Sequence, residues 1–216
     1  MANPEILVGG DEPRGRSPDS PPLPPEPPLA DEVVLLRLPC AADVDAIAAA
    51  CADPEIARWI PVPVPYSRSD ARAFLDEAAA GWSAGTDLTF VIEERASATL
   101  AGMIDLRRGD APGRASVGYW LAPGGRGRGL ATRAVRLVAA WAFADRTLQR
   151  LELLTMVGND PSGRVALRAG FRRGGILRQY LPFRGRAVDA VMYSIGRDDG
   201  DGTAGEGPAA DAPAGV

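Results

Sequence analysis

Short stretches in which apolar and polar residues alternate predict the strands of a β-sheet. These stretches are rich in branched aliphatic and aromatic residues, which favour an extended backbone. The loops at 95–98 and 108–113 are short enough to join neighbouring strands as antiparallel hairpins. The expected strands are 33–38, 88–93, 100–106, 115–121, 150–157, 176–180 and 187–195.

Apolar residues recur at helical spacing in the intervening stretches. The clearest case begins at Leu130, where Ala134, Leu137, Val138 and Trp141 fall on one face. By contrast, the alternate prolines of 59–66 exclude a helix and predict an extended loop. Helices are expected over 43–52, from Ser67 or Ser69 to Trp82, from Leu130 onward, and over 161–169.

The order of these elements predicts an α/β domain of the mixed α+β kind. A strand, two helices, three strands, a helix, a strand, a helix and two strands follow one another along the chain. Such an order gives a mixed, mostly antiparallel sheet of six to seven strands that is flanked by helices. A strand–helix–strand unit lies at its centre, over 115–157.

Both ends of the chain lack this periodicity. Residues 1–30 hold nine of the twenty prolines, and residues 198–216 consist mainly of Gly, Ala, Pro and acidic residues. Such segments bury too little apolar surface to offset the entropy that folding removes. We therefore expect one folded domain, 31–197, between two disordered tails, 1–30 and 198–216.

A turn rich in glycine and arginine precedes the helix that begins at Leu130. Glycine lets a ligand approach the main chain closely, and the first turn of a helix has unpaired N–H groups. Arg126 and Arg128 lie among these glycines and add positive charge, so the turn predicts a phosphate or pyrophosphate site. A flexible loop ahead of an ordinary core helix is the alternative.

Two common phosphate-binding loops do not match this turn. A P-loop needs Gly-Lys-Ser/Thr, and the chain contains no lysine. The dinucleotide fingerprint G-x-G-x-x-G/A also fails, because Thr132 stands three positions after Gly129.

Charge is distributed unevenly along the chain. The net charge is −5 over 1–32, +6 over 33–197 and −5 over 198–216, which together give the −4 of the whole chain. A mildly basic core suits a small polyanion such as CoA, and it falls far short of the charge density of a nucleic-acid-binding domain. We expect no nucleic-acid partner.

Other classes of protein are excluded by residues that the chain lacks. With no histidine, a His-based catalytic triad is impossible, and with only two thiols no metal site is expected. Cys40 and Cys51 should be free, because a helix would hold them too far apart for a disulfide. No apolar run is long enough to span a membrane, and Met1–Gly10 does not resemble a signal peptide, so we expect a cytoplasmic protein without a membrane partner.

Four motifs, in order along 33–196, resemble the GNAT superfamily of N-acetyltransferases. Arg126-x-x-Gly129-x-Ala131 resembles its acyl-CoA pyrophosphate loop, and Asn159-x-x-Ser162 followed by Gly170-Phe171 resembles its N-x-x-S…G-F signature. Gly118-Tyr-Trp-Leu121, and Gly185-Arg-Ala-Val-Asp189 with Tyr193-Ser194, are similar to the branch that includes ribosomal-protein-alanine N-acetyltransferases. Position 118 lacks the acid that this branch often shows.

The resemblance implies that acetyl-CoA is the cosubstrate. It implies that the strand ending in Tyr119, Trp120 and Leu121 splays from its neighbour and pairs its backbone with pantetheine. The N–H groups of the turn would hold the pyrophosphate, helped by the two arginines. The implied cosubstrate-binding residues are Tyr119, Trp120, Leu121, Arg126, Gly127, Arg128, Gly129, Leu130, Ala131, Thr132 and Asn159.

The resemblance also implies direct attack of an amine on the thioester, which requires proton transfer at both ends. Many family members place a Tyr where this chain has Ala166, so Ser162 is the candidate to protonate or hydrogen-bond the leaving thiolate. Alternatively, Ser162 bonds to the backbone and Asn159 is a helix cap. Asp105 is the candidate base, with Glu93 as a second possibility, because alternation alone does not show which side either faces.

The acceptor is an amine of unknown identity. An α-amine is about a tenth neutral at pH 7, whereas a lysine amine is neutral in about one molecule in a few thousand. This difference favours the N-terminal amine of a protein or peptide. A small-molecule amine, such as an antibiotic or metabolite, and a catalytically silent acyl-CoA-binding module are the alternatives, and both a monomer and a homodimer stay open.

Overall fold

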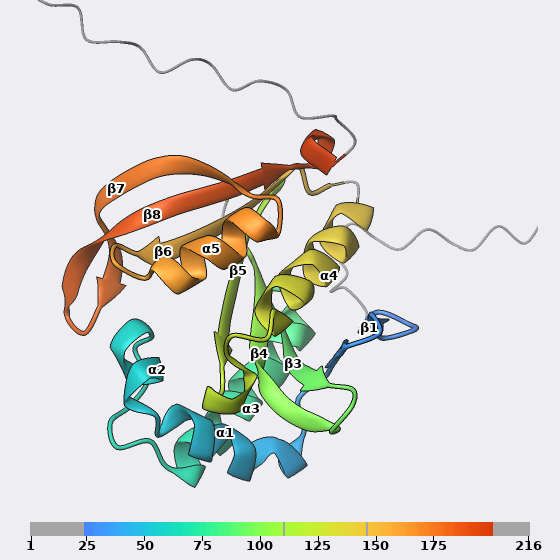
Figure 1. Ribbon diagram of the computed structural model, residues 1–216, viewed down its shortest axis with the longest axis vertical. Coiled ribbons are helices and arrows are strands. Elements are labelled where there is room, and N and C mark those ends of the chain that lie inside the picture. The colour runs from blue at the N-terminus through green and yellow to red at the C-terminus, as the bar shows by residue number, and fades with distance from the viewer. Residues whose placement is uncertain (1–23, 110, 146, 201–216) are drawn as a thin grey trace, which may run out of the picture.

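The protein is built on an eight-stranded sheet (Figure 1). The structure is a computed structural model that describes residues 24–200 apart from residues 110 and 146. The strand order is β1-β2-β3-β4-β5-β6-β8-β7, and among these strands only β5 and β6 pair in parallel. The strands are β1 Leu29–Ala30, β2 Val34–Arg37, β3 Asp87–Glu94, β4 Thr99–Arg108, β5 Arg114–Leu121, β6 Arg150–Met156, β7 Arg172–Phe183 and β8 Arg186–Gly196. The predicted mixed, mostly antiparallel sheet is confirmed.

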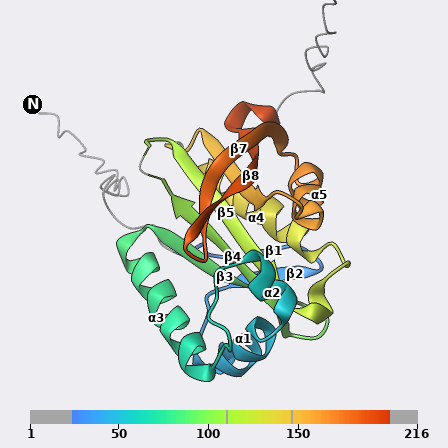
Figure 2. The same cartoon turned by 90° about the vertical axis from the view of Figure 1, so that its left-hand side faces the viewer.

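Helices pack on both faces of this sheet, and each face has its own apolar core (Figure 2). Successive side chains of a strand point to opposite faces, as the end of β5 shows. Tyr119 packs into the core beneath α4 and α5, whereas Trp120 packs into the core formed with α1, α2 and α3. The helices are α1 Val44–Cys51, α2 Pro54–Trp59, α3 Arg68–Ala84, α4 Leu130–Ala144 and α5 Asp160–Arg168.

The parallel pair β5 and β6 separates after a short contact. The two strands pair only over Arg114–Ser116 and Arg150–Glu152. Beyond Ser116, β5 continues to pair with β4, while β6 continues to pair with β8. The strands therefore form a wedge that widens toward Leu121, which is the splay that the family resemblance implies.

Three elements differ from the sequence prediction. The helix α2 occupies a stretch for which the sequence predicts no element and reaches the first residue of the predicted loop 59–66, because Asp53 accepts a hydrogen bond from Glu55 N at 3.1 Å and Pro54 fits the first helical turn. The strand β7 extends well beyond the predicted 176–180, since register shifts near Gly175 and after Leu177 interrupt its alternation. The two-residue strand β1 raises the strand count to eight.

The ends of the described chain extend slightly into the predicted tails. Leu29 and Ala30 pair with β2, and Asp199 accepts a hydrogen bond from Gly196 N at 2.8 Å. Of the two predicted tails, residues 1–23 and 201–216 lie outside the described residues. Within the described part of the chain, no helix has the length and apolar character needed to cross a membrane. Cys40 and Cys51 are free thiols, as predicted.

Candidate active site

The glycine-rich turn between β5 and α4 lies at the open end of the wedge. Gly127 and Gly129 have φ angles of +73° and +77°, which only glycine adopts without strain. A Cβ atom added at either position would meet no atom within 4 Å, so the space in front of this turn is open. The turn therefore exposes its main chain.

The start of α4 adds further main-chain donors at this point. Gly129 is the N-cap and supplies no side-chain acceptor, so first-turn N–H groups are left for another partner. Leu130, Ala131 and Thr132 are buried, whereas the three residues before them, 127–129, are exposed. This geometry suits an anion.

The two arginines of the turn are already bound to carboxylates. Arg126 lies 2.5 Å from Asp53 Oδ2 and also donates to Leu121 O at 3.3 Å. Arg128 forms an ion pair with Glu94, whose pKa it holds below the usual range. Their charges are thus partly neutralised, and the main chain of the turn becomes the principal anion-binding feature.

A hydrogen bond between two hydroxyl groups joins β5 to α5 across the wedge. Tyr119 Oη and Ser162 Oγ lie 2.7 Å apart, and burial raises the pKa of Tyr119 to about 12. Asn159 is the N-cap of α5, and its Oδ1 accepts a hydrogen bond from Ser162 N at 3.3 Å. The sequence does not predict Tyr119 as the partner of Ser162, because nothing in the local sequence links residues 43 positions apart.

On the opposite face of β5, the Asp105 carboxylate fills the space above a glycine. Asp105 pairs with Gly118 across β4 and β5, and a Cβ at position 118 would lie 3.0 and 3.1 Å from the two carboxylate oxygens. Any other residue at 118 would displace this carboxylate. Asp105 therefore places a carboxylate next to position 118, where the branch that includes ribosomal-protein-alanine N-acetyltransferases often has an acidic residue.

The environment of Asp105 makes it a weak acid. Its Oδ1 is buried and has no hydrogen-bond partner in the described part of the chain, while Oδ2 accepts from Arg107 at 3.1 Å. Burial raises the pKa of Asp105 to about 6, despite the opposing effect of Arg107. Glu93, the other candidate base, instead forms a structural ion pair with Arg37 at 2.6 Å.

The unpredicted helix α2 lies next to the turn between β7 and β8 (Figure 2). A Cβ added at Gly158, next to Asn159, would lie 4.0 Å from the Trp59 ring. Arg184, at the turn between β7 and β8, donates to Ala57 O at 3.0 Å and to Val62 O at 3.3 Å. The Asp53-Pro54 pair is the sequence signal that could have predicted this helix.

Comparisons with known proteins agree with this geometry. Residues 34–172 match the sequence profile of the Acetyltransferase (GNAT) domain family. The uncharacterised N-acetyltransferase YoaA of Bacillus subtilis (strain 168) is 28% identical over 168 residues, which cover 77% of this chain and 95% of YoaA. YdaF of Bacillus subtilis (strain 168), provisionally named a ribosomal N-acetyltransferase, is 36% identical over 105 residues, or 48% of this chain and 57% of YdaF. The structure of Mycobacterium smegmatis RimJ in complex with CoA-disulfide matches with a TM-score of 0.68 and 27% identity, over 76% of this chain and 81% of RimJ.

Proposed function

The chain belongs to the GNAT acetyltransferase family, and from this membership we propose that it acetylates the N-terminal α-amine of a protein or peptide. Transfer of an acetyl group from acetyl-CoA to an amine is the activity of the family. The observation that carries the proposal for this chain is the wedge between β5 and β6, with the glycine-rich turn, exposed over residues 127–129, at its open end.

Acetyl-CoA is expected to lie along this wedge. The main-chain N–H groups from Gly127 to Thr132 would bind the pyrophosphate, and Arg126 and Arg128 would lie on its flanks. Beyond Ser116, the backbone of β5 has no strand partner on the wedge side among the described residues, so the segment Tyr119–Leu121 can bond to the amides of pantetheine. Asn159 would hold Ser162 in place as the cap of α5.

We assign the leaving-group chemistry to the Tyr119–Ser162 pair. The amine nitrogen forms a bond to the carbonyl carbon of the thioester, the carbon–sulfur bond breaks, and the thiolate needs a proton. Ser162 would donate it and take a proton in turn from Tyr119, and the resulting phenolate would take a proton from solvent, because the Tyr119 pKa of about 12 favours the protonated form at pH 7. This pair supports an active enzyme over a silent binding module.

Asp105 is the proposed base for the attacking amine. Asp105 belongs to β4 and pairs with Gly118, the residue of β5 just before Tyr119. Its side chain therefore lies on the face of the sheet opposite to that of Tyr119, and the two proton transfers have separate groups on the two faces. With a pKa of about 6, Asp105 is mostly ionised at pH 7 and can accept the proton that the amine loses. An α-amine needs less help from such a base than a lysine amine.

The name of one relative supports a ribosomal-protein or other polypeptide acceptor. YdaF is provisionally named a ribosomal N-acetyltransferase. The test is mass spectrometry of two matched peptides incubated with acetyl-CoA: one has a free N-terminus and no lysine, and the other has a blocked N-terminus and one lysine. We expect acetylation of the free N-terminus. Acetylation of only the lysine peptide, or of small amines alone, would contradict the proposed substrate class.

A further inference from the structure

The short helix α2 is held by polar contacts at its two ends. Among its residues, all of which are described, only Ile56 is buried. At its start, Asp53 is the N-cap and accepts a hydrogen bond from Glu55 N at 3.1 Å. Toward its end, Arg184 of the β7–β8 turn donates to Ala57 O at 3.0 Å. A helix this short is not stable alone, so its position depends on these contacts.

The N-cap of α2 is also joined to the glycine-rich turn. Asp53 Oδ2 is buried and lies 2.5 Å from the Arg126 guanidinium, its ion-pair partner in the described part of the chain. Arg126 in turn donates to Leu121 O at 3.3 Å, so one guanidinium connects α2, the turn and the end of β5. The Glu55 N–H group and Arg126 hold the pKa of Asp53 below its usual range, so Asp53 is ionised at pH 7.

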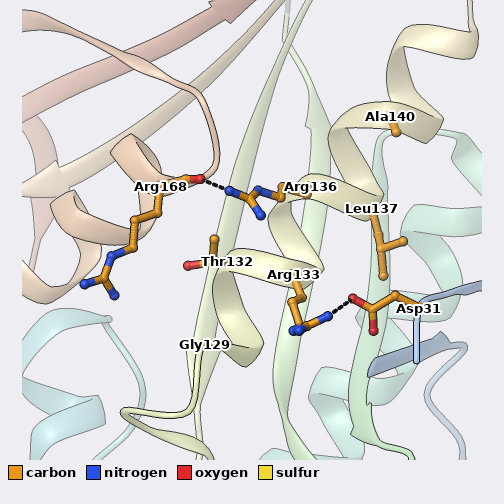
Figure 3. Close-up of a pocket in the computed structure, with 8 residues that line it drawn as sticks. All are labelled: Asp31, Gly129, Thr132, Arg133, Arg136, Leu137, Ala140 and Arg168. Atoms are coloured by element: carbon orange, nitrogen blue, oxygen red, sulfur yellow. Dashed lines mark hydrogen bonds and ion pairs between the residues drawn. The ribbon is translucent and has the colours of Figure 1, made fainter. Parts of the chain in front are cut away.

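The neighbouring arginines of α4 point elsewhere. Figure 3, a close-up of the groove along α4, shows Arg133 turned toward Asp31, its ion-pair partner at 2.8 Å. It also shows Arg136 turned toward the main-chain carbonyl of Arg168, to which it donates. The second arginine of the turn pairs with a carboxylate of β3. Among the described arginines of the turn and of α4, Arg126 is therefore the one that pairs with the start of α2.

The last residue of α2 lies against the segment that leads into α5. A Cβ added at Gly158 would lie 4.0 Å from the Trp59 ring. Gly158 directly precedes Asn159, the N-cap of α5, and the first turn of α5 holds Ser162. A shift of α2 would therefore change the space beside Ser162, where the acceptor is proposed to meet the thioester.

We propose that Asp53 is a positioning residue, which acts through Arg126 to hold α2 against the cosubstrate turn and thereby aligns the acceptor with acetyl-CoA. The Asp53 carboxylate also competes with the pyrophosphate, because both anions bind the same guanidinium. Asp53 thus strengthens acceptor binding and weakens CoA binding. The inference rests on the CoA site of the proposed function and adds a residue of α2 to the groups that align the reaction.

The test replaces Asp53 by Asn, which is an equally good N-cap but carries no charge. We expect calorimetry on the full chain to show about threefold tighter binding of acetyl-CoA, the size of effect that a partly exposed ion pair provides. With the peptide that has a free N-terminus, the KM for the peptide should rise about fivefold at saturating acetyl-CoA. A residue that only stabilised the fold would weaken the binding of both ligands.

Asp145→Asn is the matched control. Asp145 Oδ1 accepts from Thr147 N at 2.9 Å and Oδ2 pairs with Arg108 at 2.8 Å, so Asp145 makes the same two kinds of contact as Asp53. It follows the last residue of α4, at the opposite end of that helix from the glycine-rich turn. This variant should change neither the CoA affinity nor the KM for the peptide.

Arg126→Gln tests whether Asp53 acts through Arg126. This variant should raise the KM for the peptide by about the same factor as Asp53→Asn, and the double variant should raise it no further. In contrast to Asp53→Asn, it should weaken CoA binding, because it removes a positive charge beside the pyrophosphate. A further rise of KM in the double variant would overturn the inference, since Asp53 would then act independently of Arg126.

The remaining outcomes separate this inference from the proposed function. An Asp53→Asn variant in which both ligands bind as before, or both bind more weakly, would overturn the inference and leave the proposed function intact. If the unaltered protein binds acetyl-CoA but acetylates no N-terminal peptide, the proposed acceptor is wrong, and the change in CoA affinity alone decides the inference. If the unaltered protein does not bind acetyl-CoA, the CoA site is wrong and the inference fails with it.

Discussion

Tyr119 Oη and Ser162 Oγ lie 2.7 Å apart and connect the two sides of the wedge, since Tyr119 belongs to β5 and Ser162 to the first turn of α5. The contact orients a serine hydroxyl that would otherwise be free to rotate. A phenol with a raised pKa is a poor acid by itself, but it can resupply a proton to a hydroxyl that has just given one away. The pair is therefore expected to act as a unit.

The first prediction is that Ser162→Ala lowers kcat by about 10²–10⁴-fold, the usual contribution of general acid catalysis. The Kd for acetyl-CoA should change little, because the proton is needed chiefly in the transition state. Tyr119→Phe should lower kcat as well, and the double variant should lose no more than the worse single one. Thiol release with a peptide substrate measures kcat, and calorimetry measures Kd.

Ser83→Ala provides a control for this prediction. Ser83 is also a helical serine, but its hydroxyl donates to Ala79 O at 2.9 Å on the exposed side of α3. Its removal should leave kcat unchanged. If Ser162→Ala behaves in the same way at a chemistry-limited step, solvent protonates the thiolate and Ser162 is only a residue of the first helical turn.

How far the sequence predicts this site depends on whether its parts are local. The glycine turn and the Asn159–Ser162 segment are contiguous, and both lie where the motifs suggest. The partners of the turn arginines, Asp53 and Glu94, come from distant elements, so their neutralising effect is invisible in the sequence. Alternation along a strand likewise cannot give the face on which Asp105 lies; that follows from its register with Gly118.

The second prediction concerns Gly129 and the cosubstrate. Gly129→Val should abolish measurable CoA binding, because a branched side chain disfavours the φ of +77° and obstructs the main chain of the turn. The protein should still fold, since a Cβ at this position meets no atom within 4 Å. Calorimetry and thermal unfolding measure the two effects.

Gly185→Val is a matched control, because Gly185 also has a φ of +77° and open space around its Cβ position. It lies at the turn between β7 and β8, away from the predicted pyrophosphate site. We expect both variants to lose a similar amount of stability and only Gly129→Val to lose CoA. Unchanged CoA affinity in Gly129→Val would show that the turn is not the binding site.

The third prediction defines the ends of the folded domain. A chain truncated to residues 24–200 should keep the Tm and the CoA affinity of the full chain, because segments of the tails' composition contribute little to folding. A chain that begins at Val33 should be less stable by about 1–3 kcal/mol, since it lacks β1 and the Asp31 carboxylate that binds Arg133. Denaturant unfolding measures the difference. A large loss of stability in the 24–200 chain would mean that a removed tail packs on the domain.

The last prediction is the pH dependence of catalysis. Attack requires a neutral α-amine, with a pKa near 8, and on our proposal also an ionised Asp105, with a pKa of about 6. Both requirements are lost as the pH falls, so a plot of log kcat/KM against pH should rise with a slope of two below pH 6 and a slope of one between pH 6 and 8. In Asp105→Asn, the rate should fall about 10²–10⁴-fold, and only the slope of one, from the amine, should remain. A profile that keeps its steeper part in Asp105→Asn, with little loss of rate, would show that water and not Asp105 takes the proton from the amine.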